Sequence, residues 1–197
     1  MSKTPNLAQG RPYLAIPGPS VMPDAVLRAM HRAAPNIYAG ELIEMMPGLA
    51  ADLKRVARTK HHVAMYIGNG HAAWEAALVN VVQPGDKILV PATGRFGLGW
   101  GQMATCLGVE TDIIDFGKQS PMDMDRIADT LRADTAHEIK AILATHVDTS
   151  SSIRNDISGL RKVLDTLEHP ALLMADCIAS LGCDVFEMDA WGVDVMV

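Results

Sequence analysis

Short apolar runs alternate with longer helical patterns from residue 63 to residue 197. The apolar runs lie at 63–67, 87–90, 109–114, 140–145, 171–175 and 193–197. Helical patterns lie between most of them, at 71–82, 97–107, 122–132 and 156–167. Strands that alternate with helices pair into a mostly parallel sheet with helices packed on its two faces. The alternation therefore predicts an α/β fold.

The chain is expected to open with an arm that is separate from the domain. Residues 1–13 are mostly polar, and residues 14–20 (LAIPGPS) are typical of a rigid turn. Each proline in that turn fixes its φ angle and lacks an N–H donor. We therefore expect an N-terminal arm and turn at 1–20 and one domain at 21–197.

Two helical patterns begin this domain. In the first, 25–33, the apolar residues Val26, Leu27 and Met30 are spaced to form a stripe that faces a core. The second covers 41–58 and contains Pro47. Because proline removes a helix hydrogen bond, Pro47 predicts a kink or a break between two helices.

A glycine-rich turn, Gly68-Asn69-Gly70, separates the run 63–67 from the helix expected at 71–82. The first N–H groups of a helix have no partner within it, and the helix dipole places positive charge there. Such a turn can bind a phosphate, although an ordinary tight turn without a ligand has the same pattern. Residues 68–73 also match G-x-G-x-x-A, but the run 87–90 is not followed by the acid that a dinucleotide site needs.

Ligands of parallel sheets bind outside the carboxyl ends of the strands, so the residues after each run are informative. Those segments are 68–71, 93–96, 146–152 and 176–180. Asp176 directly follows a buried run, where an ionised carboxylate is costly unless a cation or a hydrogen-bond donor meets it. It is either a turn or helix-cap aspartate, or a carboxylate held against a protonated ring nitrogen of pyridoxal 5'-phosphate (PLP).

Three runs, in this order, resemble class V aminotransferases, and most closely their alanine–glyoxylate and serine–glyoxylate branch. They are GNGHAAWEAALVNVVQPGDKILV (68–90), THVDTSSS (145–152) and LLMADCIASLG (172–182). The resemblance extends from residue 17 to residue 197. It implies the large domain of a fold-type I enzyme, with a mostly parallel sheet flanked by helices, PLP as cofactor and normally a homodimer with its sites near the subunit interface.

The resemblance also implies roles for individual residues. Asn69, Gly70 and His71 would hold the cofactor phosphate, and Asp176, the expected catalytic residue, would pair with the pyridine nitrogen. Phe96 would stack on one face of the ring and Ile178 on the other, while Thr149 would bond the phenolic oxygen. Asn69 stands where serine or threonine is common, and Phe96 where tryptophan is frequent; both changes keep the chemistry.

The expected reaction moves an amino group from a small amino acid of the alanine or serine type to a 2-oxo acid such as glyoxylate or pyruvate. The resemblance places the lysine that binds the cofactor about five residues beyond Val197. The small domain with its carboxylate-binding arginine would follow. The 197 residues are then a truncated large domain, expected to be inactive alone. The alternatives are a dinucleotide-binding oxidoreductase and a PLP lyase or desulfurase on the same scaffold.

Composition and charge exclude several other partners. A net charge of −6 and a pI near 5.6 argue against nucleic acid and an anionic membrane surface. No apolar run approaches the ~18 residues of a membrane-spanning helix. Three cysteines without a C-x-x-C pair suit a reducing compartment, so we expect a cytoplasmic protein. No histidines, cysteines or carboxylates have the spacing of metal ligands, so we expect no metal site.

Overall fold

The computed structural model describes residues 14–16 and 18–197, so the arm expected at 1–13 lies outside the described residues. The chain forms two compact units, Met1–Met46 and Pro47–Val197. The first contains α1 (Asp24–Met30) and the beginning of α2 (Glu41–Ala57), a helix that continues into the second unit. The second unit contains all other elements and, as shown below, the candidate site.

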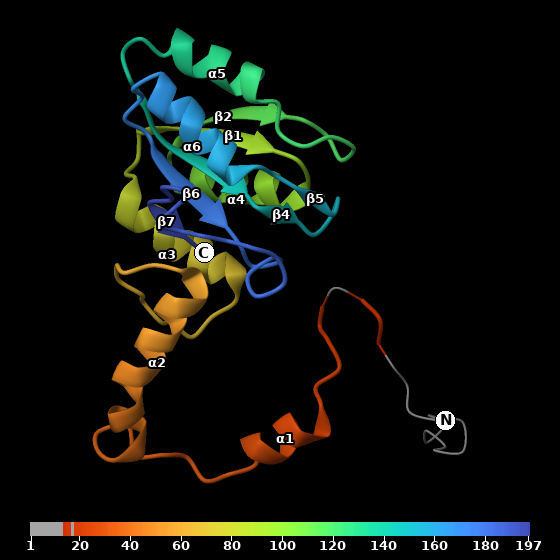
Figure 1. Ribbon diagram of the computed structural model, residues 1–197, viewed down its shortest axis with the longest axis vertical. Helices are drawn as coiled ribbons and strands as arrows, with labels where there is room; N and C mark the ends of the chain where they lie inside the picture. Colours follow the sequence, from red (N-terminus) through yellow and green to blue (C-terminus); the bar gives the residue numbers. More distant parts are fainter. Residues whose placement is uncertain (1–13, 17) are drawn as a thin grey trace. The chain divides into compact units, whose positions relative to one another are not determined.

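The second unit has the alternating order that the sequence predicts (Figure 1). After α2 come α3 (Gly70–Val81), β1 (Lys87–Ala92), α4 (Arg95–Cys106), β2 (Glu110–Asp115), α5 (Met124–Ala133), β3 (Ile139–Thr145), β4 (Val147–Asp148), β5 (Ile153–Arg154), α6 (Ile157–Thr166), β6 (Leu172–Asp176) and β7 (Val195–Met196). Five strands form one sheet in the order β2-β1-β3-β6-β7, and every pair is parallel. The short strands β4 and β5 form a separate antiparallel pair. The predicted parallel sheet is therefore confirmed.

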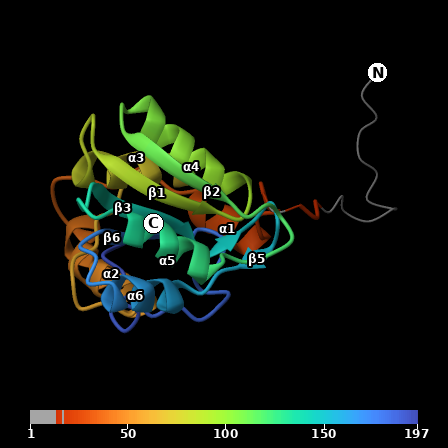
Figure 2. The same cartoon turned by 90° about the horizontal axis from the view of Figure 1, so that it is seen from above.

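Helices cover both faces of this sheet, α3 and α4 on one and α5 and α6 on the other (Figure 2). Along β1, Ile88 and Val90 pack in the same cluster as Trp100 of α4. Leu89 lies between them and points to the opposite cluster, which contains Leu160 of α6. Successive side chains of a strand point to opposite faces, so a strand buried on both sides is apolar throughout. This is why the strands appear in the sequence as continuous apolar runs.

The prediction of a strand at 63–67 is wrong. These residues follow α2 and pair with no strand in the described part of the chain. Tyr66 is 69% exposed and Ile67 fully exposed. An apolar run predicts a strand only where a neighbouring strand can accept its backbone hydrogen bonds. The run expected at 193–197 is confirmed in part, because only Val195 and Met196 are assigned to β7.

The prediction that the apolar stripe of the first helix faces a core is also wrong. α1 buries no residue, and Val26, Leu27 and Met30 are 44%, 50% and 64% exposed. Helical spacing shows that these side chains share a face, but it does not show what covers that face. In the next helix, α2 runs through Pro47 as a single element.

Helix α4 lies close to the sheet because its contact face carries glycine. A Cβ added at Gly97 would lie 3.2 Å from the Cα of Ala92, a backbone atom that cannot rotate away. A Cβ at Gly99, in the same helix, would make an ordinary contact of 3.7 Å with the Trp74 ring. The two glycines therefore offer a matched test of how closely α4 packs.

We expect Gly97→Ala to lower the free energy of unfolding by about 1–3 kcal/mol, since overpacking forces the helix away from β1. Gly99→Ala should leave it unchanged or raise it by up to about 1 kcal/mol, because alanine is the better helix former. Urea denaturation of the two variants measures the difference. Equal effects of the two changes would contradict this packing.

Candidate active site

The first part of the site is the beginning of α3. Asn69 caps this helix in an extended conformation, and its side-chain oxygen accepts a hydrogen bond of 3.1 Å from the N–H of Ala72. The N–H groups of Gly70 and His71 lie in the first helical turn, where they have no partner within the helix. The His71 ring packs on Trp74, one turn further along, with ring centroids 4.6 Å apart. This helix start can therefore offer N–H groups to an anion.

The second part is Asp176, the last residue of β6, which is 5% exposed. One carboxylate oxygen accepts the indole N–H of Trp74 at 3.1 Å, and the other accepts the N–H of Ile178 at 2.9 Å. Burial raises the pKa of Asp176, and the charge of Asp148 acts in the same direction, while the two hydrogen bonds oppose the shift. Within 14–16 and 18–197 no ion pair involves Asp176. A buried carboxylate with donors but without a counter-ion favours a cationic ligand.

These two parts lie against each other. A Cβ at Gly70 would come within 2.3 Å of the end of the Ile178 side chain, so the helix start and Ile178 are in contact. One helical turn later, Trp74 bonds Asp176 directly. The helix start and the carboxylate, which are more than 100 residues apart in sequence, therefore belong to one site.

The third part is the loop between β3 and α6, which Asp148 organises. The side chain of Asp148 is fully buried. One of its oxygens accepts the N–H groups of Phe96 (2.9 Å) and Gly97 (3.0 Å), at the beginning of α4. The other accepts the N–H (2.9 Å) and the hydroxyl (2.7 Å) of Ser150. This carboxylate joins the loop that contains Thr149 to the helix turn that contains Phe96.

Phe96 is half-buried, and its ring meets Trp74 edge-on with centroids 6.2 Å apart. Thr149 is half-buried beside Asp148, and Ile178 is 54% exposed, which leaves it accessible to a ligand. Contacts through Trp74, Asp176 and Ile178 therefore connect five of the seven predicted site residues, Gly70, His71, Phe96, Asp176 and Ile178, and Asn69 caps the same helix start. Thr149 joins them only through the loop held by Asp148, and the individual roles of the seven stay predictions.

Sequence reasoning missed Trp74 and Asp148. Asp148 lies in the segment 146–152 without a predicted role of its own, and Trp74 lies in the middle of a helix with no local signal. The hydroxyl-rich segment around Asp148 was the available hint, because buried carboxylates often accept bonds from such loops. Among the described residues, no group of three or more histidines, cysteines or carboxylates could hold a metal ion. The same part of the chain has no helix of the length and apolarity needed to cross a bilayer.

Cys177, which follows Asp176, is a poor nucleophile. Burial raises the pKa of its thiol far above the ordinary value, and the adjacent Asp176 charge adds to the shift. The thiol is 1% exposed. Packing therefore accounts for it.

His146 connects two loops of the site. Its Nδ1 lies 2.9 Å from the hydroxyl of Ser180, and its ring is buried against Phe186 and Trp191. Burial lowers the pKa of His146 below its ordinary value of 6.5, since the interior disfavours the charged ring. The unfolded chain therefore binds a proton at a higher pH than the folded protein does.

This shift predicts how stability depends on pH. The contribution of neutral His146 is complete above pH 6.5 and is lost as the pH falls from there through the lower pKa of the folded protein. In that window the slope from one group is at most about 1.4 kcal/mol per pH unit. Urea denaturation from pH 7.5 to 5 should show a smaller slope in His146→Gln. An unchanged slope would show that His146 is not buried in its neutral form.

Comparison with known proteins identifies the family of this chain. Residues 13–197 match the family model described as Aminotransferase class-V. The chain belongs to the class V aminotransferase family. Members of this family depend on PLP, and the parallel sheet flanked by helices is the PLP fold-type I architecture. The dinucleotide-binding alternative has no support from these comparisons.

Individual relatives lie in the glyoxylate branch of the family. The chain is 37% identical to a serine–glyoxylate aminotransferase of Hyphomicrobium methylovorum over 94% of its own length and 46% of the relative. It is 35% identical to one of Arabidopsis thaliana, over 94% of this chain and 47% of that one. A solved alanine–glyoxylate aminotransferase from Nostoc sp. superposes with a TM-score of 0.82 at 26% identity, covering 98% of this chain and 52% of that chain. The chain thus spans about half the length of the curated relatives it matches.

Proposed function

We propose that this chain supplies the PLP-binding part of an aminotransferase that moves an amino group from a small amino acid, of the alanine or serine type, to a 2-oxo acid such as glyoxylate or pyruvate. The observation that supports this most strongly is that a group suited to an anion and a group suited to a cation lie in one site. The N–H groups at the start of α3 suit an anion, and the buried Asp176 carboxylate suits a cation. The names of the relatives, serine–glyoxylate and alanine–glyoxylate aminotransferase, support the substrate class.

The residues present fit PLP, which has a phosphate at one end and a basic ring nitrogen at the other. The first-turn N–H groups of Gly70 and His71, with Asn69 as cap, would hold the phosphate. Asp176 has two neutral donors and, in the part of the chain that the structure describes, no paired cation, so it can accept a protonated nitrogen. Gly70 and Ile178 are in contact, which brings the two groups to one place.

When bound, PLP supplies an electron sink for charge that develops on the amino acid substrate. Asp176 keeps a positive charge on the ring nitrogen by offering a carboxylate in a buried place. Phe96 and Ile178 would offer apolar surfaces that hold the ring and exclude water. The hydroxyl of Thr149 would donate to the phenolic oxygen. Asp148 acts indirectly, because it fixes the loops that carry Phe96 and Thr149.

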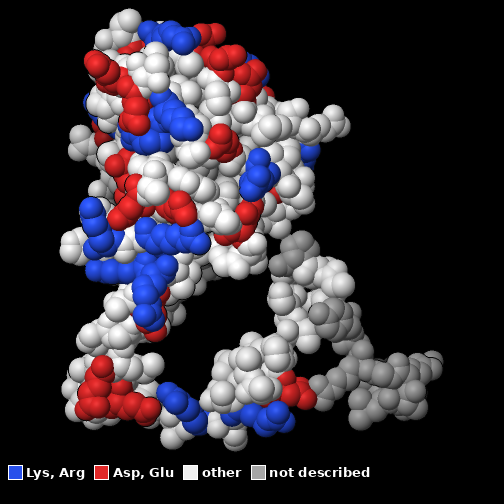
Figure 3. Space-filling model, in the orientation of Figure 1, with Lys and Arg blue, Asp and Glu red and all other residues white. Residues whose placement is uncertain are grey.

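We also propose a cytoplasmic homodimer whose PLP-binding domain covers residues 21–197, with an arm at 1–20. The three free cysteines, Cys106, Cys177 and Cys183, support a reducing compartment. Within the first unit, the exposed apolar face of α1 supports a protein partner, because such surfaces are usually covered. We propose no nucleic-acid partner, since basic and acidic side chains are mixed on the face shown in Figure 3.

Absorption spectroscopy of the full-length protein tests this function. With PLP bound we expect a band near ~410–430 nm that disappears or shifts when serine or alanine is added, and returns when glyoxylate is added. Aspartate and pyruvate, tested in the same way, define the donor and the acceptor. A protein that acquires no such band at saturating PLP would contradict the proposal.

A further inference from the structure

The hydrogen bond between Trp74 and Asp176 is buried at both ends. The indole N–H lies 3.1 Å from one carboxylate oxygen, Trp74 is 1% exposed and Asp176 is 5% exposed. Water cannot replace the indole in such a place, so the carboxylate oxygen depends on this donor. A bond from a neutral donor to a charged acceptor is stronger than a bond between two neutral groups.

The charged form of Asp176 needs such support. Burial and the nearby charge of Asp148 both favour the neutral acid. The N–H of Ile178, the indole of Trp74 and the charge of His71 favour the carboxylate. The Ile178 donor is part of the backbone, and His71 acts at a distance. Trp74 is therefore the one side chain in the described residues that donates a hydrogen bond to Asp176.

The position of Trp74 is fixed by other rings. Trp100 stacks on it at 5.9 Å with an interplanar angle of 14°, and His71 and Phe96 pack against it at 4.6 Å and 6.2 Å. A donor held in this way can fix the orientation of the carboxylate as well as its charge. Trp100 is also fully buried, yet its indole N–H has no hydrogen-bond partner among the described residues. The stack thus contains one indole that bonds a carboxylate and one that bonds nothing.

We infer that Trp74 is a positioning residue: its indole N–H keeps the Asp176 carboxylate ionised and in one orientation, so that its charge is available to the ring nitrogen of the cofactor. This role rests on the proposed function, because it concerns PLP. It adds a residue in the middle of α3 to a site otherwise formed by loops and by the ends of helices and of β6. It also gives a reason for a tryptophan one turn after the helix start that would hold the phosphate.

Two variants separate the donor from the ring. Trp74→Phe keeps an aromatic ring in the stack but removes the N–H that Asp176 accepts. Trp100→Phe makes the same chemical change in the neighbouring ring, where the N–H bonds nothing. A structural effect of losing an indole from the stack should appear in both variants. An effect through Asp176 should appear in Trp74→Phe alone.

The first readout needs no cofactor. The N–H of Ile178 bonds Asp176, so its NMR signal in the full-length apoprotein should follow the ionisation of that carboxyl as the pH is varied. We expect the midpoint in Trp74→Phe to lie about one pH unit above that of the wild type, and the midpoint in Trp100→Phe to be unchanged. In the wild type the indole N–H signal of Trp74 should titrate with the same midpoint. If Trp74→Phe does not fold, this titration of the wild-type indole signal tests whether Trp74 responds to the ionisation of Asp176.

The second readout is cofactor affinity at pH 7.5. We expect Trp74→Phe to bind PLP about tenfold more weakly than the wild type does. Binding of 1-deaza-PLP, which has carbon in place of the ring nitrogen, should be unaffected. Equal losses for both compounds, or an unchanged Ile178 midpoint in Trp74→Phe, would overturn the inference. If the wild type binds neither compound, the proposed function fails, while the Ile178 and Trp74 titrations still decide whether Trp74 controls Asp176.

Discussion

Asp176→Asn is expected to lower kcat of the full-length protein by about a hundred- to a thousand-fold, as the loss of one preorganised electrostatic group does in other enzymes. Asparagine has nearly the same volume, so the packing of β6 should be retained. Its amide has no charge to offer the cofactor ring. Its single oxygen can also accept only one of the two bonds, from Trp74 and Ile178, that the carboxylate accepts now. The measurement is steady-state turnover with serine and glyoxylate.

Asp184→Asn is the matched control for this change. Asp184 lies in the segment between β6 and β7, eight residues after Asp176, and pairs with Arg154 at the surface. An exposed ion pair contributes little, so we expect its kcat to stay within about twofold of the wild type. Circular dichroism should show that both variants are folded. If Asp176→Asn kept wild-type turnover, Asp176 would not be the carboxylate at the ring nitrogen.

Asp148→Ala is expected to have the largest effect on stability, lowering the free energy of unfolding by about 3–5 kcal/mol. The change leaves three backbone N–H groups, those of Phe96, Gly97 and Ser150, without their acceptor. Two of them lie at the start of α4, where N–H groups have no partner within the helix. Gly94 is in contact with the carboxylate as well, since a Cβ there would lie 2.5 Å from it. Urea denaturation measures the loss.

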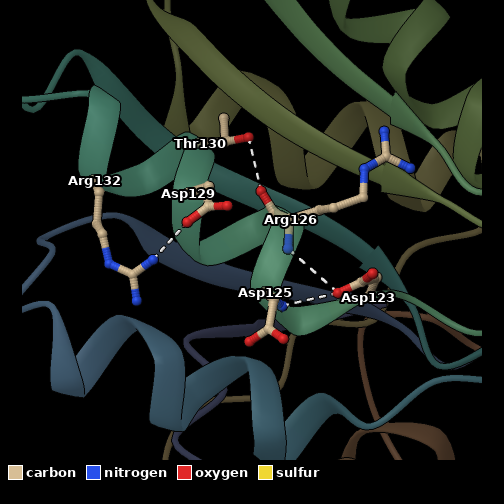
Figure 4. A network of polar contacts seen from close by, with 6 residues as sticks. All are labelled: Asp123, Asp125, Arg126, Asp129, Thr130 and Arg132. Atoms are coloured by element: carbon tan, nitrogen blue, oxygen red, sulfur yellow. Dashed lines mark hydrogen bonds and ion pairs between the residues drawn. The ribbon is translucent and has the colours of Figure 1, made fainter.

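Asp123→Ala is the control for helix capping alone. Asp123 caps α5 and accepts the N–H groups of Asp125 and Arg126 at the surface, as Figure 4 shows. Water can replace an exposed cap, so this change should cost only about 1 kcal/mol. Similar losses in the two variants would show that Asp148 is an ordinary cap and that it does not organise the site.

The strands and helices of the second unit could be predicted because each has a local signal. Strands buried on both faces appear as apolar runs, and Pro84-Gly85 marks the end of α3. The same logic failed where burial depends on a partner. The run 63–67 and the α1 stripe have the right spacing, but in the described chain residues 64–67 and the stripe are exposed. Periodicity reports which residues share a face, and only tertiary structure decides what packs on it.

The site could be predicted only in part, for a related reason. Asp176 was found because it follows a buried strand, and Gly70 because glycines precede a helix. Its contacts were not found, because they join residues far apart in sequence: Trp74 and Asp176 are separated by 102 residues, and Phe96 and Asp148 by 52. Neither pair has a local pattern, since any buried donor could have met either carboxylate.

A crystal structure of the full-length protein with PLP tests the central claim most directly. The proposal predicts the cofactor phosphate within hydrogen-bond distance of the N–H groups of Gly70 and His71, and the ring nitrogen at about 2.7–2.9 Å from an oxygen of Asp176. A cofactor bound elsewhere, or one whose ring nitrogen faces away from Asp176 while its phosphate lies at Gly70, would contradict it.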